Sequence, residues 1–477
     1  MLPFNSIIHI DKSDKLPVYL QISQQLTDLI LSGRLLPGTK LPGSRKMAGL
    51  LEVNRNTIIA VYEELDMQGW LDTRNSSGSY VKEKLPVVAE TYIKVTESAM
   101  VDDLVEVHKT YPLNFDDGQP DVRFTPLLSL TREMSALVKT DYFHRNLNYS
   151  EELRGDIKLR QQLSIYLRQT RGIDTNSDGI LITSGTVNAF HLYLHHVLSK
   201  NDAVIVGTPG YTTFNKILDT INVKTIEIAV DEDGLQVDQI EKVCQQRDIA
   251  MVYAIPHHHH PTTVKLSAER RMKLMQLSEK YNFKIVEDDY DYDFHYDSSP
   301  VLPLASYKQH DNVVYVGSFS KLLMPSIRIG FLVASPTLVL ALSRRRRYVD
   351  RCGNPLIERA MANLMESGEI NRSLKKAIKN YRVRRDLLAD LLTEELSDFI
   401  DFQKPEGGMA IWVQFREDVD IRQTLNYCRD RGLDISDPDF YNTTGNHQLR
   451  LGFAMMNEQE IKEGFSILKD SILSQFQ

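Results

Sequence analysis

From about Leu113 onward, short apolar runs that end in polar residues alternate with longer amphipathic segments. This alternation is typical of strands that are each followed by a helix, and it predicts an α/β domain with a mostly parallel sheet. Ligands of such sheets bind at the carboxyl ends of the strands, so a site is expected just past those ends. The expected strands cover residues 180–183, 203–206, 251–255, 284–287, 313–316 and 329–333.

The end of the strand at 313–316 carries the most informative residues. Ser318, Ser320 and Lys321 follow this strand, and Arg328 comes shortly afterwards. A lysine amine can form a Schiff base with an aldehyde, while hydroxyls and a guanidinium can hold a phosphate. This stretch is therefore suited to an aldehyde cofactor that carries a phosphate, which is the chemistry of pyridoxal phosphate (PLP).

A second strand end, after residues 284–287, adds a carboxylate and a phenol. Asp288 can keep a pyridine nitrogen protonated, which PLP needs in order to act as an electron sink. A buried carboxylate requires a partner, and a pyridinium is a fitting one. Tyr290 can hydrogen-bond the phenolic oxygen of the ring. The alternative is a solvated acidic cluster, because further aspartates follow at 289, 291, 293 and 297.

Three other segments give weaker signals. Gly185 and Thr186 follow the strand at 180–183 and open a helix, whose first amides can hold a phosphate. Tyr211 follows the strand at 203–206 and can stack on a flat ring, although an ordinary turn with a core tyrosine explains it equally well. Arg450 lies in an apolar run, where it is either an ion-pair partner or a bidentate ligand for a carboxylate.

Four consecutive histidines, at 257–260, suggest a metal site, but their arrangement argues against one. Neighbouring side chains on an extended chain point in alternating directions and chelate a single ion poorly. We expect one histidine to contact the ring oxygen of the cofactor and the others to face solvent or neighbouring groups. The three cysteines are scattered without metal-ligand spacing, which fits a reducing compartment. No metal is expected.

Charge and hydrophobicity exclude two classes of protein. The formal net charge of −8 argues against a protein that coats nucleic acid in bulk. No apolar run is long enough to cross a bilayer, and the N-terminus lacks a basic-then-apolar signal pattern. These features predict a cytoplasmic protein that does not enter membranes.

Residues 1–84 follow a different pattern, which predicts a winged helix-turn-helix. Helices are expected at 16–32, at 44–51 with Ser44 as the N-cap, and at 55–69 with Asn54 as the N-cap. Two short strands at 71–74 and 79–81 form a hairpin, the wing. Polar residues crowd the N-terminal end of the third helix, from which such motifs reach base edges in the major groove. The alternative is a three-helix scaffold without a role in DNA binding.

Residues 85–112 lack globular periodicity, and we interpret them as a linker with a short helix near 99–107. The domain organisation expected from sequence is therefore a DNA-binding domain at 1–84, a linker at 85–112 and an α/β domain at 113–477.

The order of motifs resembles one family along nearly the whole chain. Leu41-Pro42-Gly43-Ser44-Arg45, Asn54-Arg55-Asn56-Thr57, Tyr62, Gly69 and the Gly78 wing resemble the GntR-type winged helix. The rest resembles a fold-type-I aminotransferase, and the combination resembles the MocR/GabR subfamily of GntR-type regulators. Members with a known amino-acid effector carry an arginine at the position of Thr213. The DNA-binding residues that the resemblance implies are Ser44, Arg45, Arg55, Asn56, Thr57 and Gly78.

The resemblance also implies PLP and assigns roles in its binding. Lys321 would form the Schiff base, Asp288 would pair with the pyridine nitrogen, and Tyr290 would lie near the ring oxygen. Tyr211 would stack on the ring, and Arg450 would hold an effector carboxylate. A tyrosine at 149 would cross a homodimer interface to the phosphate bound by the other subunit. The phosphate-binding residues implied are Gly185, Thr186, Ser318, Ser320 and Arg328.

Three functions remain open on the sequence. The first is a transcriptional regulator that binds an operator in double-stranded DNA and senses an amine or amino acid through PLP. The second is a working PLP-dependent aminotransferase with an appended DNA-binding domain. The third is a regulator that responds to the level of PLP itself. We favour the first, because a sequence-reading domain gains nothing from turnover whereas the lysine machinery supports reversible amine capture.

Overall fold

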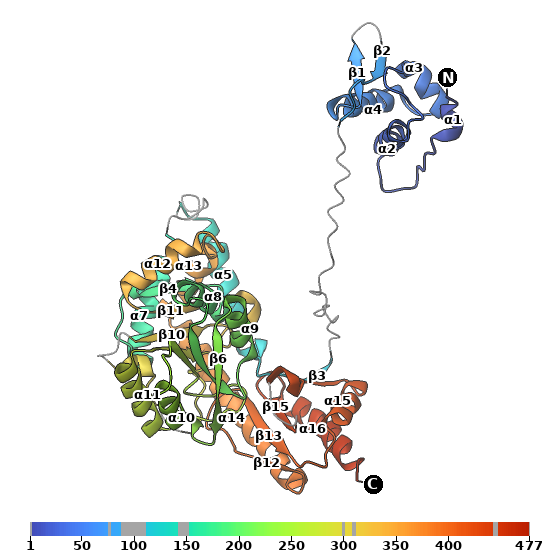
Figure 1. Cartoon of the computed structure of the whole chain (residues 1–477). Helices are drawn as coiled ribbons and strands as arrows, with labels where there is room; N and C mark the ends of the chain where they lie inside the picture. The colour runs from blue at the N-terminus through green and yellow to red at the C-terminus, as the bar shows by residue number, and fades with distance from the viewer. Residues whose placement is uncertain are drawn as a thin grey trace. The chain divides into compact units, whose positions relative to one another are not determined.

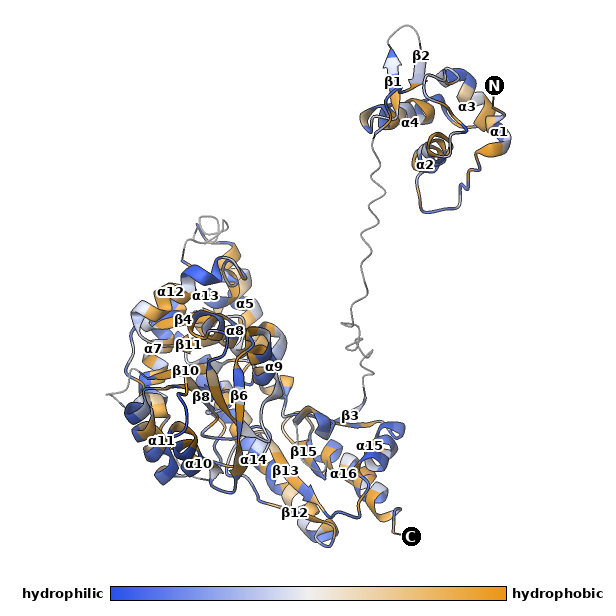
Figure 2. Ribbon diagram, in the orientation of Figure 1, coloured by the Kyte–Doolittle hydropathy of each residue, from blue (hydrophilic) through white to orange (hydrophobic). Residues whose placement is uncertain are grey.

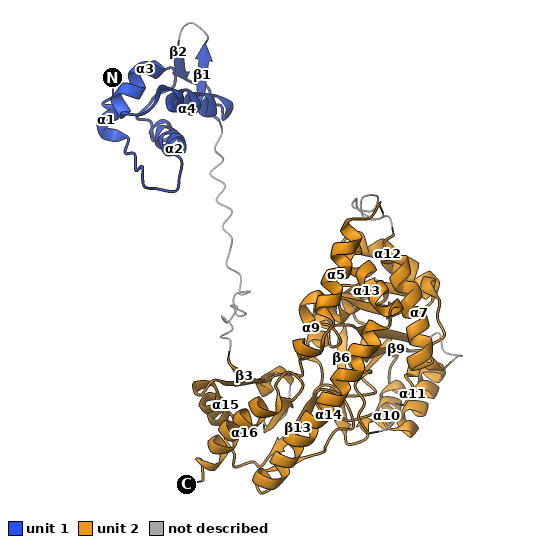
Figure 3. Ribbon diagram, turned by 180° about the vertical axis from the view of Figure 1, so that it is seen from behind, with its two compact units in different colours: residues 1–108 blue, residues 109–477 orange. Residues whose placement is uncertain are grey.

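The structure is a computed structural model that describes residues 2–74, 78–86, 111–141, 152–297, 301–307, 312–441 and 447–476. The chain divides into two compact units, residues 1–108 and 109–477, which are coloured separately in Figure 3. The short helix expected near 99–107 lies outside the described residues. No helix within the described ranges is long and apolar enough to cross a membrane.

The first unit has the helices and the hairpin expected from sequence (Figure 1). Ile22, Met47, Ile58 and Leu65 are fully buried and pack the helices around one small core. This core explains the helical spacing of the apolar residues, since each helix buries one stripe. The elements are α1 (Phe4–Ile7), α2 (Val18–Leu31), α3 (Ser44–Leu51), α4 (Arg55–Met67), β1 (Leu71–Arg74) and β2 (Gly78–Val81).

The two expected helix caps have different outcomes. The side chain of Asn54 accepts a hydrogen bond from the amide of Asn56 and so caps α4, as predicted. The prediction that Ser44 caps α3 is wrong, because Gly43 occupies the cap position and Ser44 is already helical. The turn before α3 is held in place by Tyr62, whose hydroxyl donates to the carbonyl of Pro42 at 2.6 Å, and the helix therefore begins one residue earlier than predicted. The Ser44 hydroxyl instead accepts from Arg55 Nε at 3.4 Å.

The second unit is built on an eight-stranded sheet of order β4-β11-β10-β9-β8-β5-β6-β7. Its central strands are parallel, whereas β11 runs antiparallel to both of its neighbours and β7 runs antiparallel to β6. The mostly parallel sheet and all six expected strands are therefore confirmed. The strands are β4 (Ile180–Thr183), β5 (Ala203–Thr208), β6 (Lys224–Asp231), β7 (Gly234–Leu235), β8 (Met251–Ala254), β9 (Lys284–Asp289), β10 (Val313–Ser318) and β11 (Gly330–Val333).

Helices cover both faces of this sheet and make a three-layered α/β structure. The inner strands carry hydrophobic colour in Figure 2 while the helices are mixed, as expected for a sheet buried on both sides. One face packs against α8 (Thr186–Val197), α9 (Thr212–Ile221) and α12 (Pro336–Arg346). The other face packs against α7 (Ile157–Arg171), α10 (Val237–Cys244), α11 (Ala268–Tyr281) and α13 (Pro355–Glu366), with α5 (Leu127–Val138) outside α13.

A smaller C-terminal layer brings the start of the unit beside its end. The strand β3 (Leu113–Phe115) pairs in parallel with β14 (Leu433–Ile435), so the segment after β3 runs next to the strand that carries Arg450. That segment contains Asp117 and Gly118. The layer also contains α14 (Glu369–Leu396), β12 (Ile400–Phe402), β13 (Ala410–Phe415), α15 (Ile421–Asp430), β15 (Gln448–Gly452) and α16 (Glu458–Leu473).

Candidate cofactor site and nucleic-acid interface

A cavity of about 200 Å³ lies at the carboxyl ends of the central strands. Its position matches the rule that ligands of open α/β sheets bind past the strand ends. Eight of the cofactor residues predicted from sequence line this one cavity. Gly185 lies next to the guanidinium of Arg328, which is one of the eight. The eight are Thr186, Tyr211, Asp288, Tyr290, Ser318, Ser320, Lys321 and Arg328.

One corner of the cavity is built to hold an anion. Arg328 has a left-handed backbone and donates from Nη2 to the carbonyl of Ser184 at 2.9 Å. Gly185 has φ of +90°, and a Cβ there would lie 2.6 Å from Arg328 Nη2, so the position requires glycine. The helix α8 begins at Thr186 and points its free amides into this corner. Guanidinium, amides and the hydroxyls of Ser318 and Ser320 together fit a phosphate.

A buried carboxylate also lines the cavity. Asp288 is 3% exposed, and its Oδ2 accepts a hydrogen bond of 2.6 Å from the hydroxyl of Tyr253. Its Oδ1 is buried and has no hydrogen-bond partner among the described residues. Burial raises the pKa of Asp288 to about 7. A pyridinium N–H would satisfy this open oxygen and neutralise the charge, so the acid fits the ring nitrogen of PLP.

The lysine and the two predicted tyrosines lie around the middle of the cavity. Lys321 Nζ donates to the carbonyl of Gly118 at 2.7 Å. Tyr211 meets the ring of His260 edge to face, with centroids 5.4 Å apart. The hydroxyl of Tyr290 donates to the carbonyl of His258 at 2.9 Å. The amine that could capture an aldehyde and the aromatic ring that could stack on it therefore share one chamber.

All four consecutive histidines are buried, so of the two surroundings expected for them, solvent or neighbouring groups, the structure shows neighbouring groups. Each ring has a polar partner that offsets part of the free-energy cost of burying it. The partners, in chain order, are the carbonyl of Val301, Asp291, Thr262 and Asp117. Imidazoles with such partners are tolerated inside a protein. Burial lowers the pKa of His259 to about 3. Of the four, His260 lines the cavity.

Arg450, predicted as either an ion-pair partner or a carboxylate ligand, already has a carboxylate. It is 1% exposed, its Nε lies 2.8 Å from Asp117 Oδ1, and its Nη1 donates to the carbonyl of Pro261 at 2.7 Å. Burial lowers the pKa of Arg450, but Tyr290 and Asp117 outweigh it and hold that pKa above its usual value.

Two residues of the site have no signal in the sequence analysis. Asp117 lines the cavity and pairs with Arg450, but it lies in a turn that no predicted strand precedes. Tyr253 lies within the expected strand at 251–255, and its hydroxyl donates a hydrogen bond to Asp288. Alternation along a strand indicates which face of the sheet a side chain lies on, but it does not indicate a contact with a neighbouring strand. Tyr149 lies outside the described residues.

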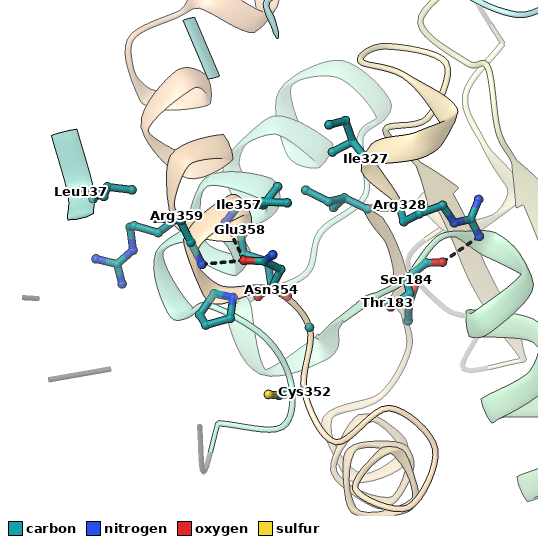
Figure 4. Close-up of a pocket in the computed structure, with 14 residues that line it drawn as sticks. Leu137, Thr183, Ser184, Ile327, Arg328, Cys352, Asn354, Ile357, Glu358 and Arg359 are labelled. Atoms are coloured by element: carbon teal, nitrogen blue, oxygen red, sulfur yellow. Dashed lines mark hydrogen bonds between the residues drawn. The ribbon is translucent and has the colours of Figure 1, made fainter. Parts of the chain in front are cut away.

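A second, larger cavity of about 540 Å³ adjoins the anion corner from the other side of Ser184 and Arg328. Figure 4 shows Arg328 donating to Ser184 and, across the cavity, Asn354 at the start of α13. Its described lining includes no lysine, and its carboxylate, Glu358, accepts a hydrogen bond from the amide of Asp156. We therefore assign the cofactor to the smaller cavity, in spite of its size.

The predicted DNA-binding residues gather at one end of the first unit, except for Gly78. Arg45, Arg55 and Asn56 are exposed, Ser44 and Thr57 are partly exposed, and the contact between Ser44 and Arg55 joins the starts of α3 and α4. Gly78 opens β2 with φ of +101°, beside the side chain of Lys40. The wing residues 75–77 lie outside the described ranges.

Two family models match the chain. Residues 114–468 match aminotransferase class I and II, and residues 18–81 match the gntR family of bacterial regulatory proteins. The matches cover the two units that the structure separates.

Similar proteins have the same two-part organisation. The chain is 24% identical to the probable rhizopine catabolism regulatory protein MocR of Rhizobium meliloti, over 98% of this chain and 96% of that protein. It is 26% identical to the uncharacterized HTH-type transcriptional regulator YdfD of Bacillus subtilis, over 95% and 96%.

Solved structures resemble the second unit. The kynurenine aminotransferase of Pyrococcus horikoshii, solved with PMP and its substrate and product, has a TM-score of 0.70 and 26% identity over 76% of this chain and 91% of that one. The multiple substrate aminotransferase of Thermococcus profundus has a TM-score of 0.71 at 24% identity, over 80% and 96%. The chain therefore belongs to the aminotransferase class I and II family, and it joins this PLP-binding fold to a gntR-type DNA-binding domain, the organisation of MocR-type transcriptional regulators.

Proposed function

We propose that this protein is a PLP-dependent transcriptional regulator that senses an amine or amino acid in the cavity around Lys321. Residues 1–84 would bind DNA, residues 85–112 would tether the domains, and residues 113–477 would hold the cofactor and the effector. The observation that carries the proposal is the open Oδ1 of Asp288, a buried acid that faces the same cavity as the lysine amine.

The residues around the cavity have separable tasks. PLP, when bound, supplies an aldehyde that reacts with amines and a ring that accepts electrons. Arg328, with the serines and the start of α8, would hold the phosphate, and Asp288 would hold the proton on the ring nitrogen. Tyr211 would stack on the ring, and Tyr290 would lie beside the ring oxygen. The carbonyl of Gly118 accepts a hydrogen bond from Lys321 Nζ and so holds the amine in place at the cavity.

We further propose that the first unit recognises an operator in double-stranded DNA. The polar starts of α3 and α4 support this, because Ser44, Arg45, Arg55, Asn56 and Thr57 are accessible there. Gly78 would allow the wing to approach the minor groove. A homodimer, in which Tyr149 of each subunit reaches the phosphate bound by the other, would present two such domains to paired half-sites. Since the DNA target of a bacterial regulator is cytoplasmic, we expect the protein to act there.

Turnover is the competing function. The second unit retains the lysine, the acid and the anion corner, and solved aminotransferases share its fold. An effector changes the geometry of the DNA-binding domains only if it binds the two arrangements with different affinities. A regulator therefore needs amine capture but no release of a keto acid. Steady release of keto acids from a panel of amino acids would favour the enzyme, and a response to PLP alone would favour a sensor of the cofactor.

The test uses full-length protein and a DNA fragment that the native protein selects from a library. Lys321→Ala should abolish the visible absorbance that PLP acquires when it is covalently held, and with it the effect of added amines on DNA binding. DNA binding itself should persist, because the first unit has its own core. Lys273→Ala, at a partly exposed lysine of α11, provides a control with the same loss of charge. Native protein that stays colourless with PLP would contradict the proposal.

A further inference from the structure

Asp117 occupies the end of the cavity where an effector carboxylate would be expected. Its Oδ1 lies 2.8 Å from Arg450 Nε, and its Oδ2 lies 2.7 Å from His260 Nε2. The hydroxyl of Tyr441 donates to Oδ1 at 3.3 Å. The next residue, Gly118, accepts the hydrogen bond from Lys321. One short turn therefore contacts both the reactive amine and the buried arginine.

The charges at this end of the cavity already balance. Burial alone raises the pKa of Asp117, but His260 and Arg450 oppose it and hold that pKa below its usual value. Asp117 therefore remains ionised and neutralises Arg450. Burial lowers the pKa of His260, against the effect of Asp117, which raises it. Among the described residues that line the cavity, the remaining cations are Lys321 and Arg328, which serve the aldehyde and the phosphate.

A ligand with a carboxylate beside its amine would meet an unfavourable environment here. Its carboxylate would approach the negative charge of Asp117, and like charges in a partly buried site repel. To reach Arg450, the ligand carboxylate would have to displace Asp117 from its contacts with Arg450 and His260. A ligand without that carboxylate avoids both costs, because the Asp117–Arg450 pair can stay intact.

We propose that the effector is a primary amine without a carboxylate next to its amino group, and that Asp117 imposes this selection. The inference rests on the proposed function, because it names the chemical class that the cavity admits. It assigns Asp117 as a specificity-determining residue. Arg450, in this arrangement, holds Asp117 rather than the effector.

The experiment compares matched pairs of ligands on the full-length protein loaded with PLP. Each pair is an amino acid and the amine that lacks its carboxylate: phenylalanine with phenethylamine, leucine with isoamylamine, and lysine with cadaverine. Dissociation constants come from the change in the visible spectrum and, independently, from isothermal titration calorimetry. The variants are Asp117→Asn, which removes the charge at constant shape, and Asp117→Glu, which keeps the charge. Asp418→Asn, on the exposed surface, removes the same charge far from the cavity.

The native protein should bind at least one amine about tenfold or more tightly than its amino acid. Asp117→Asn should reduce or invert this preference by gaining affinity for the amino acid, whereas Asp117→Glu and Asp418→Asn should retain it. Amino acids that bind native protein as tightly as their amines would overturn the inference and leave the proposed function standing. A preference that survives in Asp117→Asn would remove Asp117 as its cause. Protein that never takes up PLP would overturn the proposed function itself. If Asp117→Asn does not fold, judged by circular dichroism, the native pairs still decide the ligand class.

Discussion

The two ends of the cavity handle charge in opposite ways. At the cofactor end, Asp288 keeps one buried oxygen without a hydrogen-bond partner among the described residues, and the anion corner presents a guanidinium and the start of a helix. At the other end, Arg450 and Asp117 form an ion pair at 2.8 Å, and His260 and Tyr441 contact the same carboxylate.

At the cofactor end, the protein leaves a buried charged group for a ligand to pair with. At the other end, the protein itself provides both members of the ion pair. An uncompensated buried acid is costly to keep, so its presence indicates that a partner arrives from outside. A closed ion pair is stable without a ligand and resists one that would break it. In the function proposed here, the cofactor end holds PLP, whereas the other end selects the amines that react with it.

The strongest test of the comparison removes the acid at the cofactor end. Asp288→Asn should lower PLP affinity by about a hundredfold or more, because a pyridinium would lose its ionised partner in a buried site. Equilibrium dialysis against PLP measures the change. Glu227→Gln, on the partly exposed strand β6, serves as a matched control for the loss of one carboxylate. An affinity within threefold of native would show that Asp288 does not face the ring nitrogen.

The pH dependence of PLP-free protein should reflect the same acid. Burial raises the pKa of Asp288 to about 7, above its ordinary 3.8, so the folded state binds a proton more tightly than the unfolded state does. Its contribution to stability is full below about pH 4 and is lost as the pH rises through 7, with an effect on the order of 4 kcal/mol. Urea unfolding across this range should show a steeper loss for native protein than for Asp288→Asn. Parallel profiles would contradict the assignment.

The closed pair at the other end calls for a double-mutant cycle. Arg450→Met should destabilise the protein by about 2–3 kcal/mol, because it leaves Asp117 without its main cationic partner. The cost is limited because the side chain of Asp117 is partly exposed to water. Adding Asp117→Asn should recover much of that loss, and PLP affinity should change little in either variant. Urea unfolding gives the free energies. Additive effects of the two substitutions would show that the residues do not act as a pair.

The smallest expected effect comes from the glycine of the anion corner. Gly185→Ala places a Cβ against Arg328 in a backbone conformation that favours glycine, which should cost about 1–2 kcal/mol and weaken PLP binding. Gly49→Ala, in the middle of α3 with open space around it, should instead leave stability unchanged or slightly raise it. Thermal unfolding of the two variants distinguishes a steric effect at the corner from a general effect of replacing glycine.

Local patterns predicted the parts of the site that lie on one strand end each. Lys321, Asp288 and Arg328 follow strands whose apolar runs are visible along the chain, and the sheet brings those ends together. The N-cap at Asn54 was predicted equally well, because a cap depends on its own helix. The cap at Ser44 was predicted wrongly because the hydroxyl of Tyr62, from another helix, holds the preceding turn.

The strand β6 and the pairing of Asp117 were not predictable in this way. The strand β6 is largely half-exposed, so its residues lack the continuous apolar run of a buried strand. Asp117 and Arg450 lie more than 300 positions apart and meet because β3 joins the C-terminal layer. The burial of the four histidines likewise depends on partners from other segments.

The sequence by itself determined the α/β class, the winged helix and the chemistry available to the cofactor, since hydrophobic period and residue type act locally. Only the tertiary structure decided which charges remain open and which are already paired. Electrostatic pairing depends on distance in space and on burial, and neither can be read from position along the chain. For this protein, the unpaired Asp288 supports the assignment of the PLP site, and the Asp117–Arg450 ion pair supports the proposed selection among amines.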